Sequence, residues 1–106
     1  MSAPQLAAIA RLFAVLSEPS RLVLVQALHD GPLTVSQLVA ACGMKQANVS
    51  KHLGVLHVNH VVRRQREGIS VRYEIADPLI FSLCNLVRGK MARDTKCAAA
   101  LFDPEI

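Results

Sequence analysis

The sequence has no tryptophan, one tyrosine and three phenylalanines among its 106 residues, so aromatic side chains make up only 4% of it. Proteins that bind single-stranded DNA or RNA usually stack the bases on exposed aromatic rings, and this scarcity disfavours that function. Internal repeats and low-complexity runs are also absent. No apolar run approaches the ~20 residues needed to cross a bilayer, and we expect no membrane partner.

Features of an enzyme are missing as well. The eight acidic residues are scattered along the chain, and neither a glycine-rich phosphate loop nor a cysteine–histidine arrangement is evident. Catalysis would need a nucleophile with a base, or paired carboxylates, in one pocket. We therefore expect that the protein is not an enzyme and that it requires no cofactor.

The chain has three cysteines, an odd number that disfavours a disulfide framework. Its apolar beginning, Met1–Leu16, has no basic leader and is interrupted by Arg11, which argues against a secretory signal peptide. We expect reduced thiols in the cytoplasm. Residues 1–106 are expected to form a single domain. Alone, such a domain buries only ~60–65% of its unfolded surface, which favours a dimer that hides more.

The positive charge of the chain lies in one segment. Six basic residues and a single acid, Glu67, lie between Lys45 and Arg72, so these 28 residues carry a charge of +5. The rest of the chain has six basic and seven acidic residues, which leaves it at −1. Such a cluster is typical of a site for a polyanion, although a solvated basic surface is the default interpretation of an isolated charge run.

The first part of the chain predicts two helices. The first covers residues 5–16, with its apolar residues on one face. Ser17 is predicted to cap the second helix, and Pro19 lies in its first turn. This second helix is expected to continue to Leu28 and to stop before Gly31-Pro32.

A third helix and a fourth are joined by a short turn. Thr34 and Gln37 have the spacing of a capping box, so the third helix is expected to begin there and to run to Cys42, with Gly43 after its end. The fourth helix begins three residues later, within Met44–Val62. Two helices joined by a short glycine-containing turn are typical of a helix-turn-helix.

The fourth helix has two unlike faces. Val49, Leu53 and Leu56 follow the i, i+4, i+7 spacing of a buried helix face. The opposite side has no large apolar residue. It carries Ala47, Asn48, Ser50, Lys51 and Gly54.

A basic hairpin follows the fourth helix. Val71, Tyr73 and Ile75 alternate with charged residues, as in a half-buried strand. Glu67 and Gly68 can turn the chain, which makes a two-stranded hairpin of uncertain register.

A last helix is predicted after the hairpin and completes the order of helices and strands. Asp77 and Pro78 are predicted to cap it, and it runs at least to Met91, with Phe102 as its furthest limit. The predicted fold class is therefore mainly α with a small β-hairpin, in the order α-α-α-α-β-β-α. This is the order of a winged helix-turn-helix.

Three stretches together resemble the ArsR-type (ArsR/SmtB) family of bacterial repressors, over roughly Leu12 to Val87. They are "LSEPSRLVLVQAL", "LTVSQLVAACGMKQANVSKHLGVL" and "VVRRQREGISVRYEI". The resemblance implies a homodimer built by the first and last helices, a recognition helix in the major groove of DNA and a wing near the minor groove. One position departs from the family, which usually has glycine after the recognition helix where this chain has His60. Because a residue with a Cβ tolerates a left-handed backbone less well, a locally different turn is expected there.

The residues themselves fit double-stranded DNA. A major groove about 12 Å wide admits one helix, and the N-terminal residues of that helix contact the base edges. Base contact is predicted for Gln46, Ala47, Asn48 and Ser50, and phosphate contact for Lys51, whereas His52 lies between core and surface and is a less certain contact. The wing is predicted to add salt-dependent affinity through Arg63, Arg64, Arg66 and Arg72. Solvation of the helix start by its polar residues is the alternative.

Family members release DNA when a metal, metalloid or sulfur species binds, but three family sites are absent here. Two cysteines at the start of the third helix are replaced by Thr34 and Ser36, and the last helix has no histidine. A cysteine pair between the second and last helices fails because the second-helix position is Val25.

The chain's own cysteines leave one candidate pair. Cys42 completes an apolar stripe of the third helix and is predicted to be a core residue. Cys84 and Cys97 lie on the last helix, thirteen residues or about 20 Å apart on a straight helix, so they could meet only across a dimer or at a break in the helix. They are the candidates for sensing an effector, such as a metalloid or metal ion on the thiolates.

His57 and His60 have a spacing that can hold zinc, but no third ligand is obvious nearby, so surface histidines are the favoured interpretation. The sequence thus predicts a dimeric, cytoplasmic, DNA-binding repressor released by a thiol-reactive or metalloid effector. A winged-helix protein-interaction module, or a regulator without a small-molecule inducer, is the alternative.

Overall fold

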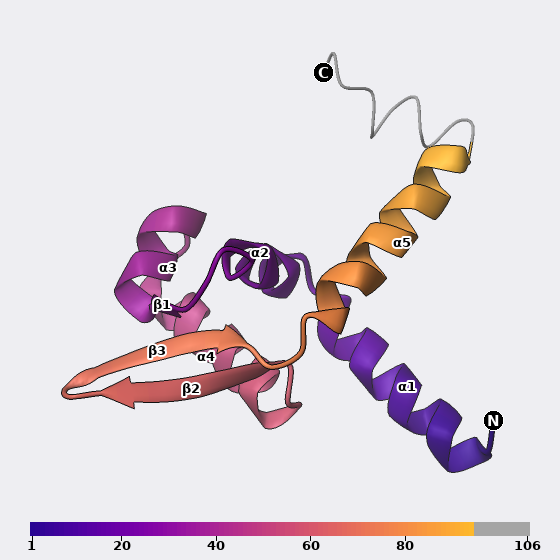
Figure 1. Ribbon diagram of the computed structural model, residues 1–106, viewed down its shortest axis with the longest axis horizontal. Helices are drawn as coiled ribbons and strands as arrows, with labels where there is room; N and C mark the ends of the chain where they lie inside the picture. Colours follow the sequence, from indigo (N-terminus) through magenta and orange to yellow (C-terminus); the bar gives the residue numbers. More distant parts are fainter. Residues whose placement is uncertain (95–106) are drawn as a thin grey trace.

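Five helices and three strands follow one another along residues 1–94, the part of the chain that the computed structural model describes (Figure 1). The N-terminal elements are α1 (Ala3–Leu16), α2 (Pro19–Ala27), β1 (Leu33–Thr34) and α3 (Val35–Cys42). They are followed by α4 (Gln46–Val58), β2 (Val62–Glu67), β3 (Ser70–Ile75) and α5 (Leu79–Arg93). The predicted helices are all present. The stretch up to Phe102 that was considered for the last helix lies partly outside the described residues.

The turn between α1 and α2 differs from the prediction in its cap. Ser17 belongs to the end of α1, where its hydroxyl donates to the carbonyl oxygen of Ala14 at 2.7 Å. Glu18 is the cap of α2, because its carboxylate accepts from the backbone N–H of Ser20 at 3.0 Å. This hydrogen bond holds the pKa of the Glu18 carboxyl below its ordinary value. The assignment of Ser17 as cap was therefore wrong by one residue.

The capping box of α3 is confirmed. The Thr34 N–H donates to Gln37 Oε1 at 2.9 Å, and the Gln37 N–H donates to Thr34 Oγ1 at 3.2 Å. At the other end of α3, Gly43 has a φ of 68°, the left-handed conformation that glycine adopts without steric cost. Both ends of α3 are thus determined by local chemistry.

The sheet has three strands in the order β1-β3-β2, whereas the sequence predicted only the hairpin. The missing strand, β1, pairs Leu33 with Tyr73 in antiparallel register. In the hairpin, Val62 pairs with Ile75 and Glu67 with Ser70, which leaves a two-residue turn at its tip. The short strand β1 thus ties the hairpin to the start of α3.

The core lies between α2, α3, α4 and the base of the sheet. Leu24 and Val25 from α2, Leu38 from α3 and Leu53 from α4 have no exposed surface. The other buried apolar residues are Val15, Leu16, Leu28, Val49, Leu56, Val61, Val62 and Ile80. This core holds α4 by one side only, and its opposite side faces solvent.

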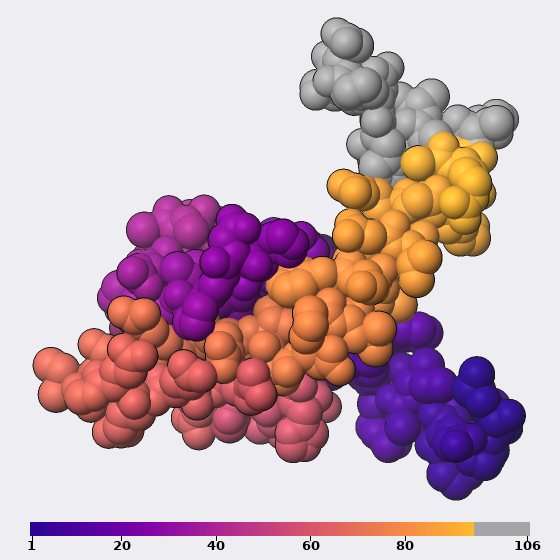
Figure 2. All heavy atoms as spheres, viewed as in Figure 1, coloured from indigo at the N-terminus to yellow at the C-terminus, as the bar shows by residue number. Residues whose placement is uncertain are grey.

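Helices α1 and α5 project from this body. Helix α1 buries only Val15 and Leu16 at its C-terminal end, and α5 buries only Ile80 in its first turn. The outer ends of the two helices stand apart from each other in the space-filling view (Figure 2). The radius of gyration is 15.5 Å, whereas a compact domain of 100 residues has a value of about 13 Å. Among residues 1–94, no helix combines the length and apolar character needed to cross a membrane.

Candidate nucleic-acid interface

Helix α4 presents the two faces that its sequence predicted. Val49, Leu53 and Leu56 have no exposed surface. The residues on the other side are all exposed, namely Gln46, Ala47, Asn48, Ser50, Lys51 and Gly54. Five of these six belong to the predicted DNA contacts, and they form one continuous strip along the outer side of α4. The strip is small, polar and basic, so a flat or grooved partner can approach the helix backbone closely.

Two details of α4 favour a close approach. Within residues 1–94, nothing lies within 4 Å of the place where a Cβ on Gly54 would be, so packing does not require glycine there. At the start of the helix the cap position is Lys45, and its side chain makes no capping bond within the described structure. The first-turn N–H groups are therefore available to an anionic ligand such as a DNA phosphate.

His52 does not belong to this strip, which corrects its assignment as a DNA contact. Only 9% of the residue is exposed, and its ring lies on the inner side of α4. Arg21 from α2 reaches it, with 3.5 Å between Arg21 Nη1 and His52 Nδ1. The sequence did not identify Arg21 as relevant to α4, because 31 residues separate the two and no local pattern relates them.

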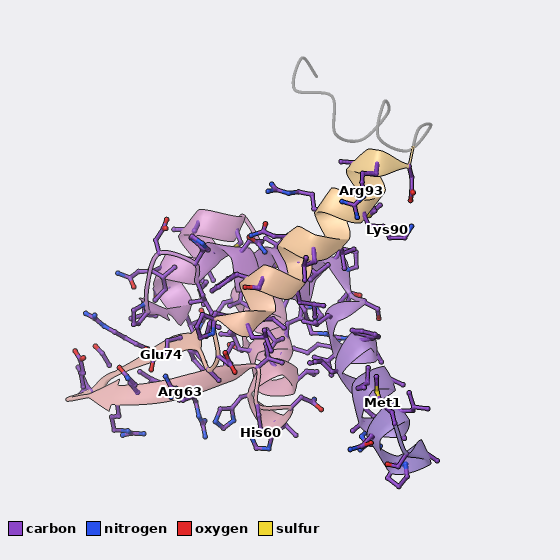
Figure 3. The ribbon with its side chains drawn as sticks, turned by 45° about the vertical axis from the view of Figure 1, so that its right-hand side comes forward. Met1, His60, Arg63, Glu74, Lys90 and Arg93 are labelled. Atoms are coloured by element: carbon purple, nitrogen blue, oxygen red, sulfur yellow. The ribbon has the colours of Figure 1, made fainter. Side chains whose placement is uncertain are left out.

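The wing formed by β2 and β3 has an outer side with internal ion pairs. Arg63 Nη2 lies 3.3 Å from Glu74 Oε1, and the Gln65 amide donates to the same oxygen at 2.7 Å. Arg72 Nε lies 4.0 Å from Glu67 Oε2. Figure 3 shows Arg63 and Glu74 on neighbouring strands of the wing. The positive charges of Arg63 and Arg72 are thus partly neutralised by acids on the same wing.

The other two predicted wing residues have different surroundings. Arg64 pairs across the sheet with Tyr73, and Arg66 pairs with Val71, so both arginines share the inner side of the sheet with half-buried residues. In the described part of the chain, neither arginine has an acid within ion-pair distance. Arg64 and Arg66 are therefore the wing residues whose charge remains available to a polyanion.

The end of α4 keeps the left-handed turn at His60, which has a φ of 62°. The Val61 N–H donates to Leu56 O at 2.9 Å and the His60 N–H donates to His57 O at 3.1 Å, the pair of bonds that defines a Schellman motif. The expectation of a different turn at this position was wrong. The turn has the usual geometry, and what is unusual is that a histidine adopts the left-handed conformation that glycine normally adopts.

The described residues contain no metal site. His57 and His60 line one open hollow with Arg63 and Arg64, and these two guanidinium groups would repel a cation. Within residues 1–94, no group of three or more histidine, cysteine or acidic side chains is close enough to hold a metal ion. The described part of the chain therefore holds no complete ligand set for a metal ion.

The cysteines lie in different surroundings. Cys42 is half-buried against the core, and this burial raises the pKa of its thiol. Cys84 lines an apolar hollow of about 370 Å³ between α1, α2 and α5, with Phe13 and Met91 among its neighbours. Cys97 lies outside the described residues. Cys42 was predicted to be a core residue, and it is instead half-buried, packed against the core from the end of α3. The pairing of Cys84 with Cys97 stays a prediction.

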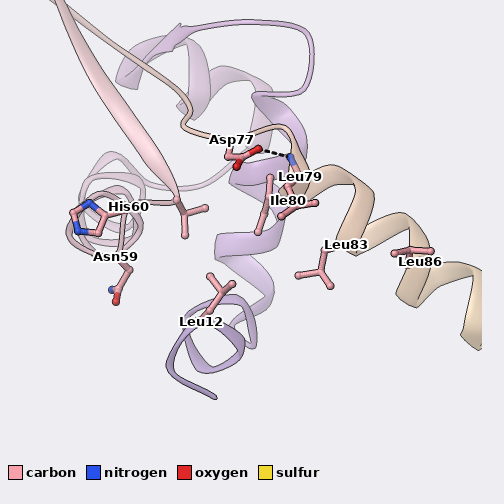
Figure 4. A pocket seen from close by; sticks show the side chains of 9 residues that line it. Leu12, Asn59, His60, Asp77, Leu79, Ile80, Leu83 and Leu86 are labelled. Carbon is pink, nitrogen blue, oxygen red and sulfur yellow. Dashed lines mark hydrogen bonds between the residues drawn. The ribbon is translucent and has the colours of Figure 1, made fainter. Parts of the chain in front are cut away.

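A second apolar hollow, of about 360 Å³, lies where α1, the end of α4 and the start of α5 meet (Figure 4). Leu12 from α1 lines it together with Ile80 and Leu83 from α5. At its rim, Asp77 Oδ1 accepts from the Leu79 N–H at 2.9 Å, which confirms the predicted role of Asp77 at the start of the last helix. The hollow continues the exposed apolar surface of the two projecting helices.

Comparison with known proteins agrees with this architecture. The family described as "Helix-turn-helix domain" matches residues 16–57. The HTH-type transcriptional regulator CmtR of Mycobacterium tuberculosis is 40% identical over 89 residues, which cover 83% of this chain and 75% of that protein. The chain belongs to the ArsR-type family of winged helix-turn-helix transcriptional regulators. The predicted class, a DNA-binding regulator rather than an enzyme, is thereby confirmed.

Two further proteins are similar to this ArsR-type chain, one in sequence and one in solved structure. The probable mercury resistance operon repressor of Streptomyces lividans is 37% identical over 79 residues, covering 74% of this chain and 63% of that protein. The solved homodimeric winged helix-turn-helix DNA-binding domain Mb0332 of Mycobacterium bovis, described as a possible ArsR-family transcriptional regulator, has a TM-score of 0.78 and 28% identity. That match covers 89% of this chain and 87% of the solved one. The predicted fold class is confirmed by this structural similarity.

Proposed function

We propose that this ArsR-type chain is a homodimeric repressor that binds double-stranded operator DNA and leaves it when a thiol-reactive or metalloid effector binds. The observation that supports the proposal best is the exposed strip of α4, which carries polar groups and Lys51 and has no large apolar residue. On the opposite face, Val49, Leu53 and Leu56 are fully buried. The strip and the arginines of the wing belong to the segment that carries the excess positive charge. Residues 1–106 act as one domain in this proposal.

The residues of the strip have distinct roles in the proposed complex. Gln46 and Asn48 can form hydrogen bonds with base edges, and Ser50 can bond to a base edge or a phosphate. Ala47 can contact a thymine methyl group. Lys51 lies one residue beyond these groups and contributes a phosphate contact, which provides affinity without sequence information.

The dimer is proposed to form through α1 and α5. Both helices leave large apolar side chains in solvent, since Leu6 and Phe13 are each 53% exposed, Leu86 is 72% exposed and Val87 is 49% exposed. A second copy of the chain would cover these residues together with the two apolar hollows beside α5. The homodimeric relative Mb0332 supports this proposal, because a similar fold is described there as a dimer.

The effector is proposed to act on two thiols, Cys84 of α5 and Cys97, which lies outside the described residues. Cys84 lies in the apolar hollow that α5 shares with α1 and α2, so a change at its sulfur would alter the packing of the proposed dimer surface. A thiophilic ion or electrophile would displace the thiol proton on binding. The relative named as a mercury resistance operon repressor supports this class of effector, because mercury binds thiolates strongly.

The DNA-binding part of the proposal can be tested by selecting duplexes from a random library with the wild-type protein. Asn48→Ala should change the preferred sequence, because a base contact provides about 1–3 kcal/mol of discrimination, whereas Lys51→Ala should weaken binding to all sequences alike. Lys90→Ala is the matched control, because it removes an exposed lysine from α5, where Lys90 pairs with Asp94 at 2.9 Å.

The outcome also separates DNA binding from the use of the winged helix as a protein-interaction module. Binding through several phosphates weakens steeply as salt concentration rises. Absence of any duplex with salt-dependent affinity would contradict the proposal and favour the protein module. An identical preferred sequence for wild type and Asn48→Ala would contradict only the assignment of base contacts to α4.

A further inference from the structure

Ile69 is the most exposed large apolar residue of the wing, with 102% of its reference surface accessible. It occupies the second position of the two-residue turn between β2 and β3, at the far tip of the hairpin. Gly68 precedes it with a φ of 61°, and Ile69 has no positive φ, a combination typical of a type II′ turn. This turn requires the glycine but sets no requirement for a branched apolar side chain after it.

The fold does not use the Ile69 side chain. The apolar core ends at the base of the hairpin, with Val62 and Ile75 paired there. Beyond that point every residue of β2 is exposed and polar or charged. An isoleucine at the tip forms no hydrogen bond with water or phosphate, so only contact with another apolar surface can stabilise it.

The surroundings of Ile69 favour DNA as the source of that surface. Arg66 lies three residues before Ile69, on the inner side of the sheet. Arg72 lies three residues after Ile69, on the outer side. The nearest acid, Glu67, has its carboxylate 4.0 Å from Arg72 Nε. An apolar tip beside the unpaired charge of Arg66 and the partly neutralised charge of Arg72 is complementary to a groove that has phosphates along both edges and sugars and base edges between them.

The groove is defined by the arrangement of α4 and the wing. The hairpin projects away from the body of the molecule, and its tip is the part of the wing furthest from that body (Figure 1). If α4 occupies a major groove, the neighbouring groove on either side along the duplex is a minor groove. A minor groove is about 6 Å wide, which admits the side chain of a tight turn but not a helix.

We propose that Ile69 enters the minor groove beside the recognition site and makes the wing prefer A·T over G·C pairs there. This inference rests on the proposed DNA-binding function. In the minor groove, G·C differs from A·T by the 2-amino group of guanine. An isoleucine against that amino group would remove its water without replacing the lost hydrogen bonds, whereas the A·T surface lacks this donor.

The test uses base analogues that change only the minor groove. A duplex selected by the wild-type protein is prepared with inosine·C in place of G·C, or 2,6-diaminopurine·T in place of A·T, at the positions protected by the wing. Addition of the 2-amino group should lower the affinity of wild type by about tenfold, the effect of losing a well-buried aliphatic contact. Ile69→Ser should bind the unmodified duplex about tenfold more weakly and should lose most of the discrimination between the analogues.

Val58→Ser is the matched control, because Val58 is an exposed aliphatic residue (73%) at the far end of α4. It should retain the wild-type response to both analogues. Equal affinity of wild type and Ile69→Ser for the unmodified duplex and for both analogues would overturn the inference, and Ile69 would then serve another partner. If wild type bound no duplex at all, the proposed function itself would fail, which is a distinct result. Thermal melting of Ile69→Ser should match wild type, since the side chain has no contact to lose.

Discussion

Arg21 Nη1 lies 3.5 Å from His52 Nδ1, and the same guanidinium donates to the carbonyl oxygens of Ala14 and Val15 at the end of α1. One side chain therefore connects the end of a projecting helix to the inner side of α4. Because arginine has only donors, a hydrogen bond between these two groups requires Nδ1 of His52 to be the acceptor, with the ring proton on Nε2. In this arrangement His52 lies on the core side of α4, and we propose that it supports the helix instead of contacting DNA.

The first prediction concerns His52. His52→Ala removes the acceptor of a half-buried arginine and should lower the free energy of unfolding by about 1–3 kcal/mol, measured by urea denaturation. His52→Asn offers an amide oxygen near the place of Nδ1 and should recover most of that loss. The sequence selected from a random library should be the same for wild type and both variants. A stable His52→Asn protein with a different preferred sequence would restore His52 to the DNA contacts.

The second prediction separates the two pairs of wing arginines. Arg64 and Arg66 have no acid beside them in the described structure, whereas Arg63 and Arg72 are paired with Glu74 and Glu67. Arg64→Ala/Arg66→Ala should therefore reduce the slope of log affinity against log salt concentration by about 1–2, given ~0.9 per lost phosphate contact. The double variant Arg63→Ala/Arg72→Ala removes the same charge and should reduce the slope less. Equal reductions would mean that the ion pairs of the wing open when DNA binds.

The third prediction concerns the strained end of α4. His60 holds a φ of 62°, a conformation that costs a residue with a Cβ roughly 1–2 kcal/mol. His60→Gly removes this strain but adds backbone freedom to the unfolded chain, so a net gain of about 0.5–1 kcal/mol in the free energy of unfolding is expected. His60→Val should be destabilising, because a β-branched residue tolerates this conformation least. The two variants are compared with wild type by urea denaturation, and a less stable His60→Gly protein would show that the imidazole itself makes a stabilising contact.

The fourth prediction concerns the cysteines. Burial raises the pKa of Cys42, so less of its thiol is ionised at neutral pH than in a free cysteine, and alkylation should accelerate only as the pH rises above the ordinary cysteine value. Cys97, which follows Lys96 in the sequence, is expected to be the more reactive thiol. Cys97→Ser should bind DNA normally and lose most of its response to an effector. Cys42→Ser should remain inducible but lose about 1–3 kcal/mol of stability, since a hydroxyl replaces a thiol in an apolar place.

Both cysteine variants are examined by titrating the protein–DNA complex with mercuric ion, an arsenical and a persulfide while release is followed by fluorescence anisotropy. Wild type in the presence of excess dithiol is the unreactive control. A fully inducible Cys97→Ser protein together with a stably folded but uninducible Cys42→Ser protein would reverse the assignment.

The features predicted correctly from the sequence are those that depend on neighbours within a few residues. The capping box of Thr34 and Gln37, the left-handed Gly43 and the buried face of α4 each follow from local spacing and local chemistry. The order of the five helices and the hairpin follows as well, because turn residues separate patterns of different period.

The features that the sequence did not predict depend on pairing between distant segments. Strand β1 has only two residues, and it exists because Leu33 pairs with Tyr73, forty residues away along the chain. Ion pairing within the wing depends on the register of β2 and β3, which the sequence left uncertain. The inward position of His52 follows from the helical period, because it stands three residues after Val49 on the buried face, but its partner Arg21, 31 residues earlier, could not be predicted from local spacing. The competition between Ser17 and Glu18 for the cap of α2 is local, but both residue types can cap, and the pattern alone did not decide between them.

The central claim is that two copies of this chain place their α4 helices in major grooves of one duplex. Hydroxyl-radical footprinting of a duplex selected by the wild-type protein, with the number of bound chains determined on the same complex, tests it most directly. The account predicts two chains per duplex and two related half-sites whose centres are separated by about 10 base pairs or a multiple of that distance. A single protected half-site occupied by one chain would contradict the account.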